Sequence, residues 1–277
     1  MERVKLIALD MDGTLLASDH WTVPERNIQA IQAASAQGIH VCICTGRMLE
    51  DASDFARRLQ LPCMLIACNG TRAADGLLPD AHIFYRQTFT REDAQAALDI
   101  LLPTGLMVNV FEDGMVSTRQ GADKREYHLV NRGLVRAVYG EDMVRAAADR
   151  GVMKIFTVAS EGEEALLAKA RAELMEKLPH LQVTSSAPSN IELMPPGAGK
   201  GTALQKMAEY LGLSSEQVMA IGDADNDLSM MGYAYHSVAM GNAPEEIKRV
   251  CRYVTDTNDA CGVAKMIENV MTTQQKR

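Results

Sequence analysis

The chain has 277 residues, 47% of them hydrophobic, a length typical of about two domains that each have a core. Its 28 basic and 36 acidic residues give a net charge of −8 without a block of Lys or Arg, which argues against a nucleic-acid partner. No apolar run is long enough to cross a bilayer, and the first residues do not resemble a signal peptide, so we expect a cytoplasmic protein without a membrane segment.

The first third of the chain predicts a parallel sheet. Short apolar runs that end in a polar or glycine cluster are typical of buried parallel strands, and they cover Val4–Leu9, His40–Cys44 and Met64–Cys68. Between the first two runs, residues 24–36 have the apolar spacing of a helix, with Pro24 at the start and Gly38 after the end. Strand, helix, strand is the pattern of a doubly wound α/β fold, so we predict a Rossmann-like core.

The first strand runs into the motif ALDMDGT, which places the carboxylates of Asp10 and Asp12 one residue apart. Like charges at close range cost energy unless a cation joins them. Open α/β sheets bind ligands at the carboxyl ends of their strands, and an ionised Asp10 there can attack phosphorus without a separate base. A simple turn at Asp12–Gly13 is the alternative, but the complete motif after an apolar strand favours a functional site.

The second predicted strand ends in CICTGR. The hydroxyl of Thr45 and the neighbouring peptide N–H can donate to a phosphoryl oxygen, and Gly46 leaves the backbone free to approach an anion. Taken alone, Thr45 is better explained as the N-cap of a helix. Its place in the same βαβ unit as Asp10 favours the phosphate interpretation.

From about Phe84 the pattern changes to hairpins mixed with helices. Thr90 and Asp93 predict the start of a helix that runs to about Leu102, and Asp113–Gly114 predicts a hairpin turn. The predicted strands Met107–Phe111 and Met115–Thr118 flank that turn. They are followed by a mostly helical stretch to Arg150, the strand Met153–Ala159, the helix Glu163–Leu178 and the strand Leu181–Thr184. We therefore predict an α+β domain of residues 84–187, inserted into a core of residues 1–83 and 188–277.

After Pro196 the parallel pattern returns and brings the third motif, MPPGAGKGTAL. It resembles the phosphate loop of nucleoside monophosphate kinases, but Met194 replaces the first glycine, and Gly201 follows Lys200 where Ser or Thr is required. A solvated lysine is one interpretation. The other, which we prefer, is a fixed positive charge for a bound phosphate. The remaining predicted elements are a helix at Thr202–Leu211, a strand at Val218–Ile221, a helix from near Asn226 and a strand at Ser237–Ala239.

The fourth motif, AIGDADNDLSMM, follows another apolar strand. Asp223, Asp225 and Asp227 imitate the opening of a calcium loop, but Leu228 occupies the position of its glycine and Ala234 that of its glutamate. Carboxylates contributed by the ends of different strands suit magnesium, which takes few protein ligands and keeps several waters. A merely solvated acidic loop is the alternative.

Together the four motifs resemble those of the haloacid dehalogenase superfamily of phosphohydrolases, and the resemblance covers essentially the whole chain. The insertion between the second and third motifs resembles the large α/β cap of the Cof-type branch. The segment CNGT, Cys68–Thr71, resembles the NGA segment of that branch, with Thr71 as a small departure.

The resemblance implies a role for each matching residue. Asp10 is the implied nucleophile that becomes an aspartyl phosphate, and Asp12 the general acid and then base. The implied phosphate and substrate contacts are Thr45, Gly46, Lys200 and Asn226, with Arg47 and Asn69 as further candidates. The implied magnesium site consists of Asp10, the backbone carbonyl of Asp12, Asp223 and Asp227, the last supporting the metal-bound waters.

We therefore expect a magnesium-dependent phosphatase of small phosphorylated metabolites, with sugar phosphates as the class that the resemblance implies. A phosphosugar mutase is an alternative because it uses the same nucleophile. A catalytically idle binding or regulatory protein is another, although such a protein has no need of Asp12. No motif indicates the oligomeric state.

Overall fold

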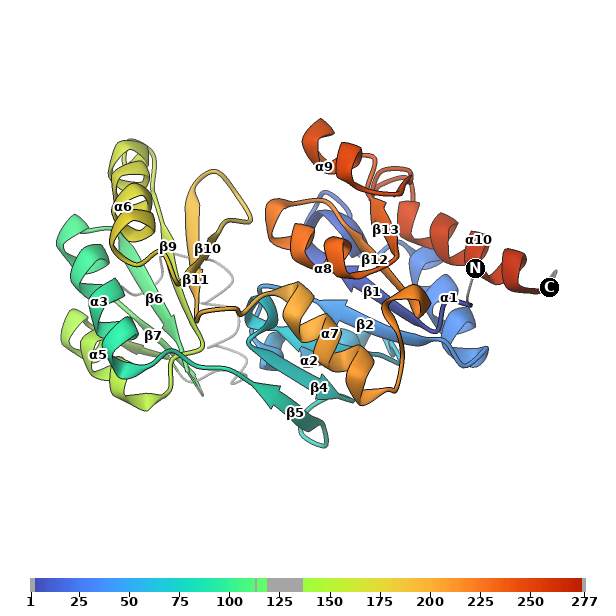
Figure 1. Cartoon of the computed structure of the whole chain (residues 1–277), viewed down its shortest axis with the longest axis horizontal. Helices are drawn as coiled ribbons and strands as arrows, with labels where there is room; N and C mark the ends of the chain where they lie inside the picture. The colour runs from blue at the N-terminus through green and yellow to red at the C-terminus, as the bar shows by residue number, and fades with distance from the viewer. Residues whose placement is uncertain (1–2, 113, 119–136, 276–277) are drawn as a thin grey trace. The chain divides into compact units, whose positions relative to one another are not determined.

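The computed structural model describes residues 3–112, 114–118 and 137–275 and forms two compact units (Figure 1). The first unit combines Met1–Tyr85 with Gly199–Arg277, and the second comprises Arg86–Ala198. Asp113 of the predicted hairpin turn and residues 119–136 of the predicted helical stretch lie outside the described residues.

An eight-stranded sheet, in the order β14-β13-β12-β1-β2-β3-β4-β5, forms the centre of the first unit. The strands are β1 (Leu6–Asp10), β2 (His40–Cys44), β3 (Met64–Ala67), β4 (Arg72–Asp75), β5 (His82–Arg86), β12 (Val218–Gly222), β13 (His236–Ala239) and β14 (Tyr253–Val254). Neighbours from β14 to β3 pair in parallel, and β4 pairs antiparallel with β3. The mostly parallel sheet confirms the predicted α/β core.

Helices cover both faces of this sheet. Along β1, Ile7 and Leu9 pack in the cluster that includes α1 (Glu25–Ala36), α2 (Leu49–Arg58) and α10 (Gly262–Gln275). Leu6 and Ala8 point to the other face and pack against α7 (Lys200–Tyr210) and α8 (Leu228–Tyr233), while α9 (Glu245–Val250) packs beside β13. Burial on both faces explains why these strands are continuous apolar runs rather than alternating ones.

The pairing register determines where the motifs lie. Asp10 is opposite Cys44 of β2, and Leu9 is opposite Ile221 of β12, so the three strands end at the same edge of the sheet. The residues that follow β2 and β12 are Thr45 and Asp223. Three motifs far apart in the sequence therefore meet at the carboxyl edge of the central strands, where open α/β sheets bind ligands.

The second unit contains a six-stranded sheet in the order β10-β11-β9-β6-β7-β8. Its strands are β6 (Met107–Phe111), β7 (Met115–Ser117), β8 (Ala137–Tyr139), β9 (Lys154–Val158), β10 (Gln182–Thr184) and β11 (Asn190–Met194). The helices α3 (Arg91–Leu101), α5 (Glu141–Ala147) and α6 (Glu164–Lys177) share one hydrophobic cluster with it. At the start of α3, the Thr90 side chain accepts a hydrogen bond from the Asp93 N–H at 3.1 Å, as its position predicted.

The end of this unit differs from the sequence prediction. We placed the boundary after residue 187, but β11 pairs antiparallel with both β9 and β10, and the unit extends to Ala198. Ile191 and Leu193 of β11 are buried in the hydrophobic cluster of the second unit, which explains the later boundary. Among the described residues, no helix has the length and apolar character needed to cross a membrane.

Candidate active site

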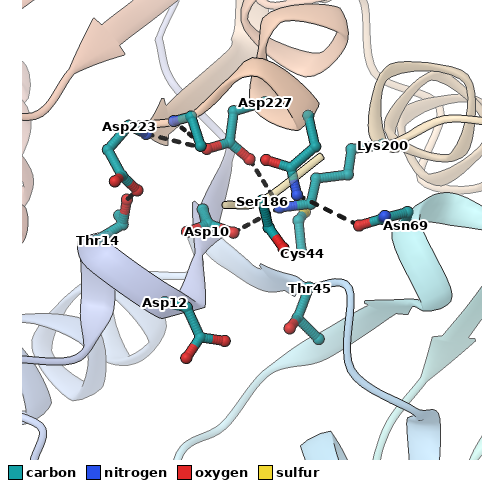
Figure 2. A network of polar contacts seen from close by, with 12 residues as sticks. Asp10, Asp12, Thr14, Cys44, Thr45, Asn69, Ser186, Lys200, Asp223 and Asp227 are labelled. Atoms are coloured by element: carbon teal, nitrogen blue, oxygen red, sulfur yellow. Dashed lines mark hydrogen bonds and ion pairs between the residues drawn. The ribbon is translucent and has the colours of Figure 1, made fainter. Parts of the chain in front are cut away.

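A buried lysine links the first, third and fourth motifs. The Nζ of Lys200 donates to Oδ1 of Asp10 at 2.5 Å and to Oδ1 of Asp227 at 2.7 Å (Figure 2). Asp10 is 5% exposed, whereas the Lys200 and Asp227 side chains are fully buried. Lys200 is the first residue of α7, not a solvated residue of a loop, so the structure excludes that alternative.

Two glycines allow the start of α7 to come this close to its neighbours. At Gly70, where φ is +92°, a Cβ atom would lie 2.2 Å from the carbonyl oxygen of Gly199. At Gly201, a Cβ atom would lie 2.3 Å from the carbonyl oxygen of Ser229, and the Gly201 N–H donates to the Ser229 hydroxyl at 3.0 Å. The backbone around Lys200 is therefore packed against the loop after β3 and against α8, and this packing fixes the position of the ammonium.

The fourth motif folds onto itself and onto the first. Oδ2 of Asp227 accepts hydrogen bonds from the backbone N–H groups of Asp223 and Ala224 at 3.0 and 3.1 Å. The Thr14 hydroxyl donates to Oδ1 of Asp223 at 2.9 Å. A Cβ at Gly13 would lie 2.4 Å from Oδ2 of Asp223, so only glycine allows this contact between the two motifs.

The three carboxylates form a site with the chemistry that a divalent cation requires. One oxygen each from Asp10, Asp223 and Asp227 lie within 4.8 Å of one another. Burial and the charge of Asp227 raise the pKa of Asp10, only partly offset by Lys200, and they raise the pKa of Asp223 to about 6. Burial, the larger cause, and the neighbouring carboxylate both disfavour the ionised form of these groups, and a hard cation that takes oxygen ligands would favour it.

The Lys200 ammonium offsets part of the negative charge of these carboxylates. Burial alone lowers the pKa of Lys200, but the carboxylates of Asp10 and Asp227 outweigh burial and raise that pKa above its ordinary value. Lys200 therefore stays positively charged at neutral pH. Three carboxylates and one ammonium leave the cluster net negative when all four groups are ionised.

Asp12 has a different environment from Asp10. It lies in the irregular turn Met11–Leu15, and its side chain is 29% exposed. Nε of Arg47 donates to Oδ2 of Asp12 at 3.0 Å, and Nη2 donates to Oδ1 at 2.7 Å. In Figure 2 the Asp12 side chain lies apart from the network of Asp10, Lys200 and Asp227. Arg47, for which the resemblance implied a substrate contact, is thus bound to the proposed general acid.

The remaining candidates surround the end of β2 and the start of α8. Thr45 is buried, and its hydroxyl accepts a hydrogen bond from the Arg47 N–H at 3.1 Å. The N-cap of α2 is Met48, so Thr45 does not cap that helix, and Gly46 lies between Thr45 and Arg47. Asn69 is buried and accepts a hydrogen bond from the Asn226 amide at 3.4 Å.

Two asparagines outside the four motifs, Asn242 and Asn258, hold the turn after Asp10. The side-chain amide of Asn242 donates to the carbonyl oxygen of Gly13 at 2.8 Å, and that of Asn258 donates to the carbonyl oxygen of Leu16 at 2.9 Å. The Asn258 N–H also donates to Oδ1 of Asn242 at 3.0 Å, which joins the two supports. The usable signal for Asn242 was its place shortly after the predicted strand Ser237–Ala239.

Comparison with known proteins identifies the family of the chain. The family described as haloacid dehalogenase-like hydrolase matches residues 7–267. The chain is 33% identical over 271 residues to the 5-amino-6-(5-phospho-D-ribitylamino)uracil phosphatase YcsE of Bacillus subtilis, covering 96% of this chain and 95% of the relative. It is 32% identical to the phosphatase YwtE of the same organism, named for the same substrate, covering 98% of this chain and 99% of the relative. A solved haloacid dehalogenase-like hydrolase from B. subtilis superposes with a TM-score of 0.83 at 30% identity, covering 96% of this chain and 99% of the other.

Proposed function

The chain belongs to the haloacid dehalogenase-like hydrolases, and we propose that it is a magnesium-dependent phosphatase that hydrolyses small phosphomonoesters through an aspartyl phosphate on Asp10. The observation that carries the proposal is the position of Asp10. Its carboxylate lies at the end of the central parallel strand, bound to a buried lysine and close to two further carboxylates. A nucleophile, a fixed positive charge and a cation site are the groups that phosphoryl transfer requires.

In the first step, a carboxylate oxygen of Asp10 forms a bond to phosphorus, and the bond between phosphorus and the leaving-group oxygen breaks. Asp12 donates a proton to the departing oxygen and afterwards takes one from the water that hydrolyses the aspartyl phosphate. The Lys200 ammonium offsets negative charge at the phosphoryl group, and the Thr45 hydroxyl and the Asn226 amide are further donors to its oxygens. The covalent route replaces one difficult displacement with two easier ones.

The carboxylate cluster supports magnesium as the cation. Asp10, Asp223 and the backbone carbonyl of Asp12 would hold it, and Asp227 would support its waters. Magnesium prefers oxygen ligands, and the cluster consists of aspartates. When bound, magnesium would reduce the repulsion between the Asp10 carboxylate and an anionic phosphate.

Sugar phosphates and related phosphorylated metabolites are the proposed substrates. YcsE and YwtE are both named as phosphatases of a ribitylamino-uracil phosphate, which places a phosphorylated sugar alcohol first among the compounds to test. The experiment measures release of inorganic phosphate from a panel that includes this compound, with magnesium and with a chelator. Release without an activating bisphosphate would distinguish a phosphatase from a mutase, and no release from any compound would contradict the proposal.

Two variants test the separate roles of the aspartates. With an aryl phosphate in a rapid-quench experiment, Asp10→Asn should give no phosphoenzyme, because a neutral amide is not a competent nucleophile. Asp12→Asn should accumulate phosphoenzyme when the aryl phosphate has a weakly basic leaving group, such as 2,4-dinitrophenolate, because this group departs without a proton whereas hydrolysis of the intermediate still needs a base. Equal labelling of both variants would show that these roles are wrong.

A further inference from the structure

We propose that Arg47 is the positioning residue that orients the Asp12 carboxylate as the proton donor to the leaving group, and that it does not bind the substrate. This inference rests on the proposed function and assigns a task to a residue beyond it. The step it affects is the first one. As the bond from phosphorus to the leaving oxygen breaks and the Asp10 oxygen bonds to phosphorus, the Asp12 carboxyl proton passes to the leaving oxygen.

The contact between Arg47 and Asp12 fixes the plane of the carboxylate. Two parallel N–H groups of one guanidinium bind the two oxygens, at 3.0 and 2.7 Å. Such a bidentate pair sets both the position and the rotation of the carboxylate, which a lysine cannot do.

The rest of Arg47 is also held in place. Its Nη1 lies 3.6 Å from Oδ2 of Asp51, in the first turn of α2. Its backbone N–H donates to the Thr45 hydroxyl, and its carbonyl oxygen accepts from the Cys68 N–H at 2.8 Å. The Arg47 side chain is only 10% exposed, so it is a rigid support for the more exposed Asp12.

The same contacts argue against a substrate-binding role. All three guanidinium nitrogens lie near a carboxylate, Nε and Nη2 at Asp12 and Nη1 at Asp51. A phosphate at Arg47 would therefore have to share the guanidinium with two carboxylates that already offset its charge. His20 is a second basic group near Asp12, with Nδ1 4.0 Å from Oδ1. Its side chain is 57% exposed, and an ion pair so exposed positions little.

The test uses phenyl phosphates of similar shape whose leaving groups differ in basicity. Rapid quench measures phosphoenzyme formation in the unmodified protein, Arg47→Gln, Arg47→Lys, Asp12→Asn and the double variant of Asp12→Asn with Arg47→Gln. General acid catalysis is worth about 10²–10⁴-fold, so losing its geometry should slow labelling by phenyl phosphate at least about tenfold in both Arg47 variants. Labelling by 2,4-dinitrophenyl phosphate, which needs no proton, should change less than about twofold.

Two further measurements distinguish positioning from other roles. Arg47→Gln should have almost no additional effect in the Asp12→Asn background, because Arg47 acts through Asp12. The inhibition constant of inorganic phosphate should stay the same. Arg58→Gln, at the last residue of α2 and 51% exposed, is the control and should behave like the unmodified protein. Thermal unfolding checks that each variant folds. If Arg47→Gln does not fold, Arg47→Lys replaces it in these measurements.

Several results would overturn the inference. Normal labelling by Arg47→Lys would show that charge alone matters. An equal loss with every leaving group, together with weaker phosphate inhibition, would make Arg47 a substrate contact, and additive losses in the double variant would separate it from Asp12. If the unmodified protein is not labelled at all, the proposed function and this inference are both rejected. If the unmodified protein is labelled normally but the Arg47 variants lose the same fraction of labelling with every leaving group, this inference alone is rejected.

Discussion

Replacing Lys200 with Met would remove the buried ammonium but keep a side chain of similar length and an apolar stem. Without a bound metal, the Asp10 and Asp227 carboxylates, 5% and 0% exposed, would lose the cation that now contacts both. Removing one partner of a buried ion pair typically costs about 3–5 kcal/mol of unfolding free energy. We expect a loss of this size for Lys200→Met at pH 8 in the presence of a chelator.

The loss should shrink as the pH falls. Burial and Asp227 already raise the pKa of Asp10, and removing Lys200 removes a charge that lowers it. A carboxyl group whose folded pKa lies above its unfolded pKa binds its proton more tightly in the native state, so its effect on stability is most favourable at low pH and worsens as the pH rises. Each pH unit over which the folded variant holds one extra proton is worth about 1.4 kcal/mol, so the loss of unfolding free energy should be smaller at pH 6 than at pH 8.

Urea unfolding at pH 6 and pH 8, with chelator, measures both effects. Lys206→Met is the matched control, since Lys206 is on the same helix, is 47% exposed and pairs with Glu209 on the surface. Its cost should stay within about 0.5 kcal/mol at either pH. The argument that the buried carboxylates need this cation would be refuted if both variants lost the same small amount of unfolding free energy. It would also be refuted if the loss for Lys200→Met were as large at pH 6 as at pH 8.

Three other predictions concern the same edge of the sheet. Gly70→Ala should lower the unfolding free energy by more than Gly38→Ala. Both glycines have positive φ, which costs an alanine about 1–2 kcal/mol, but only at Gly70 would the new Cβ overlap a carbonyl oxygen, at 2.2 Å. Equal unfolding midpoints of the two variants would contradict this. Asp223→Asn should fold but bind magnesium weakly in titration calorimetry. In the unmodified protein, the affinity for magnesium should decrease at pH values below about 6, because the pKa of Asp223 is about 6 and its carboxyl gains a proton there. Thr14→Val should move that pH midpoint upward, because the Thr14 hydroxyl bond lowers the pKa of Asp223; an unchanged midpoint would count against Asp223 as a ligand.

The elements that the sequence predicted best are buried on both faces of a sheet or clearly amphipathic. His40–Cys44 and Met107–Phe111 match β2 and β6 residue for residue, and the predicted helix at 24–36 corresponds to α1. Strands β4 and β5 were missed, because the edge segments RAAD and HIFYR include charged or exposed residues and lack a continuous apolar run. Strand β11 is apolar enough to predict, but only its pairing with β9 and β10 assigns it to the second unit.

The location of the site followed from the sequence, whereas the partners of its side chains did not. Parallel strands in register bring their carboxyl ends together, so a motif that follows a buried strand predicts where its backbone lies, as for Asp10 and Asp223. A side-chain partner depends on rotamers and on residues distant in the sequence. Arg47 and Asp12 are 35 positions apart, and a TGR motif is equally compatible with an arginine that binds phosphate and one that binds a carboxylate.

The two aspartates of the first motif show why that difference matters for chemistry. Asp10 and Asp12 are the same residue type, two positions apart, yet one is bound to a buried ammonium among carboxylates and the other to a guanidinium in a partly exposed turn. A nucleophile must keep an oxygen available to phosphorus, whereas a proton donor must keep its carboxyl in one orientation. An ammonium that binds one oxygen of Asp10 suits the first requirement, and a planar, bidentate guanidinium suits the second. The division of labour between the aspartates is therefore reflected in the two cations that contact them.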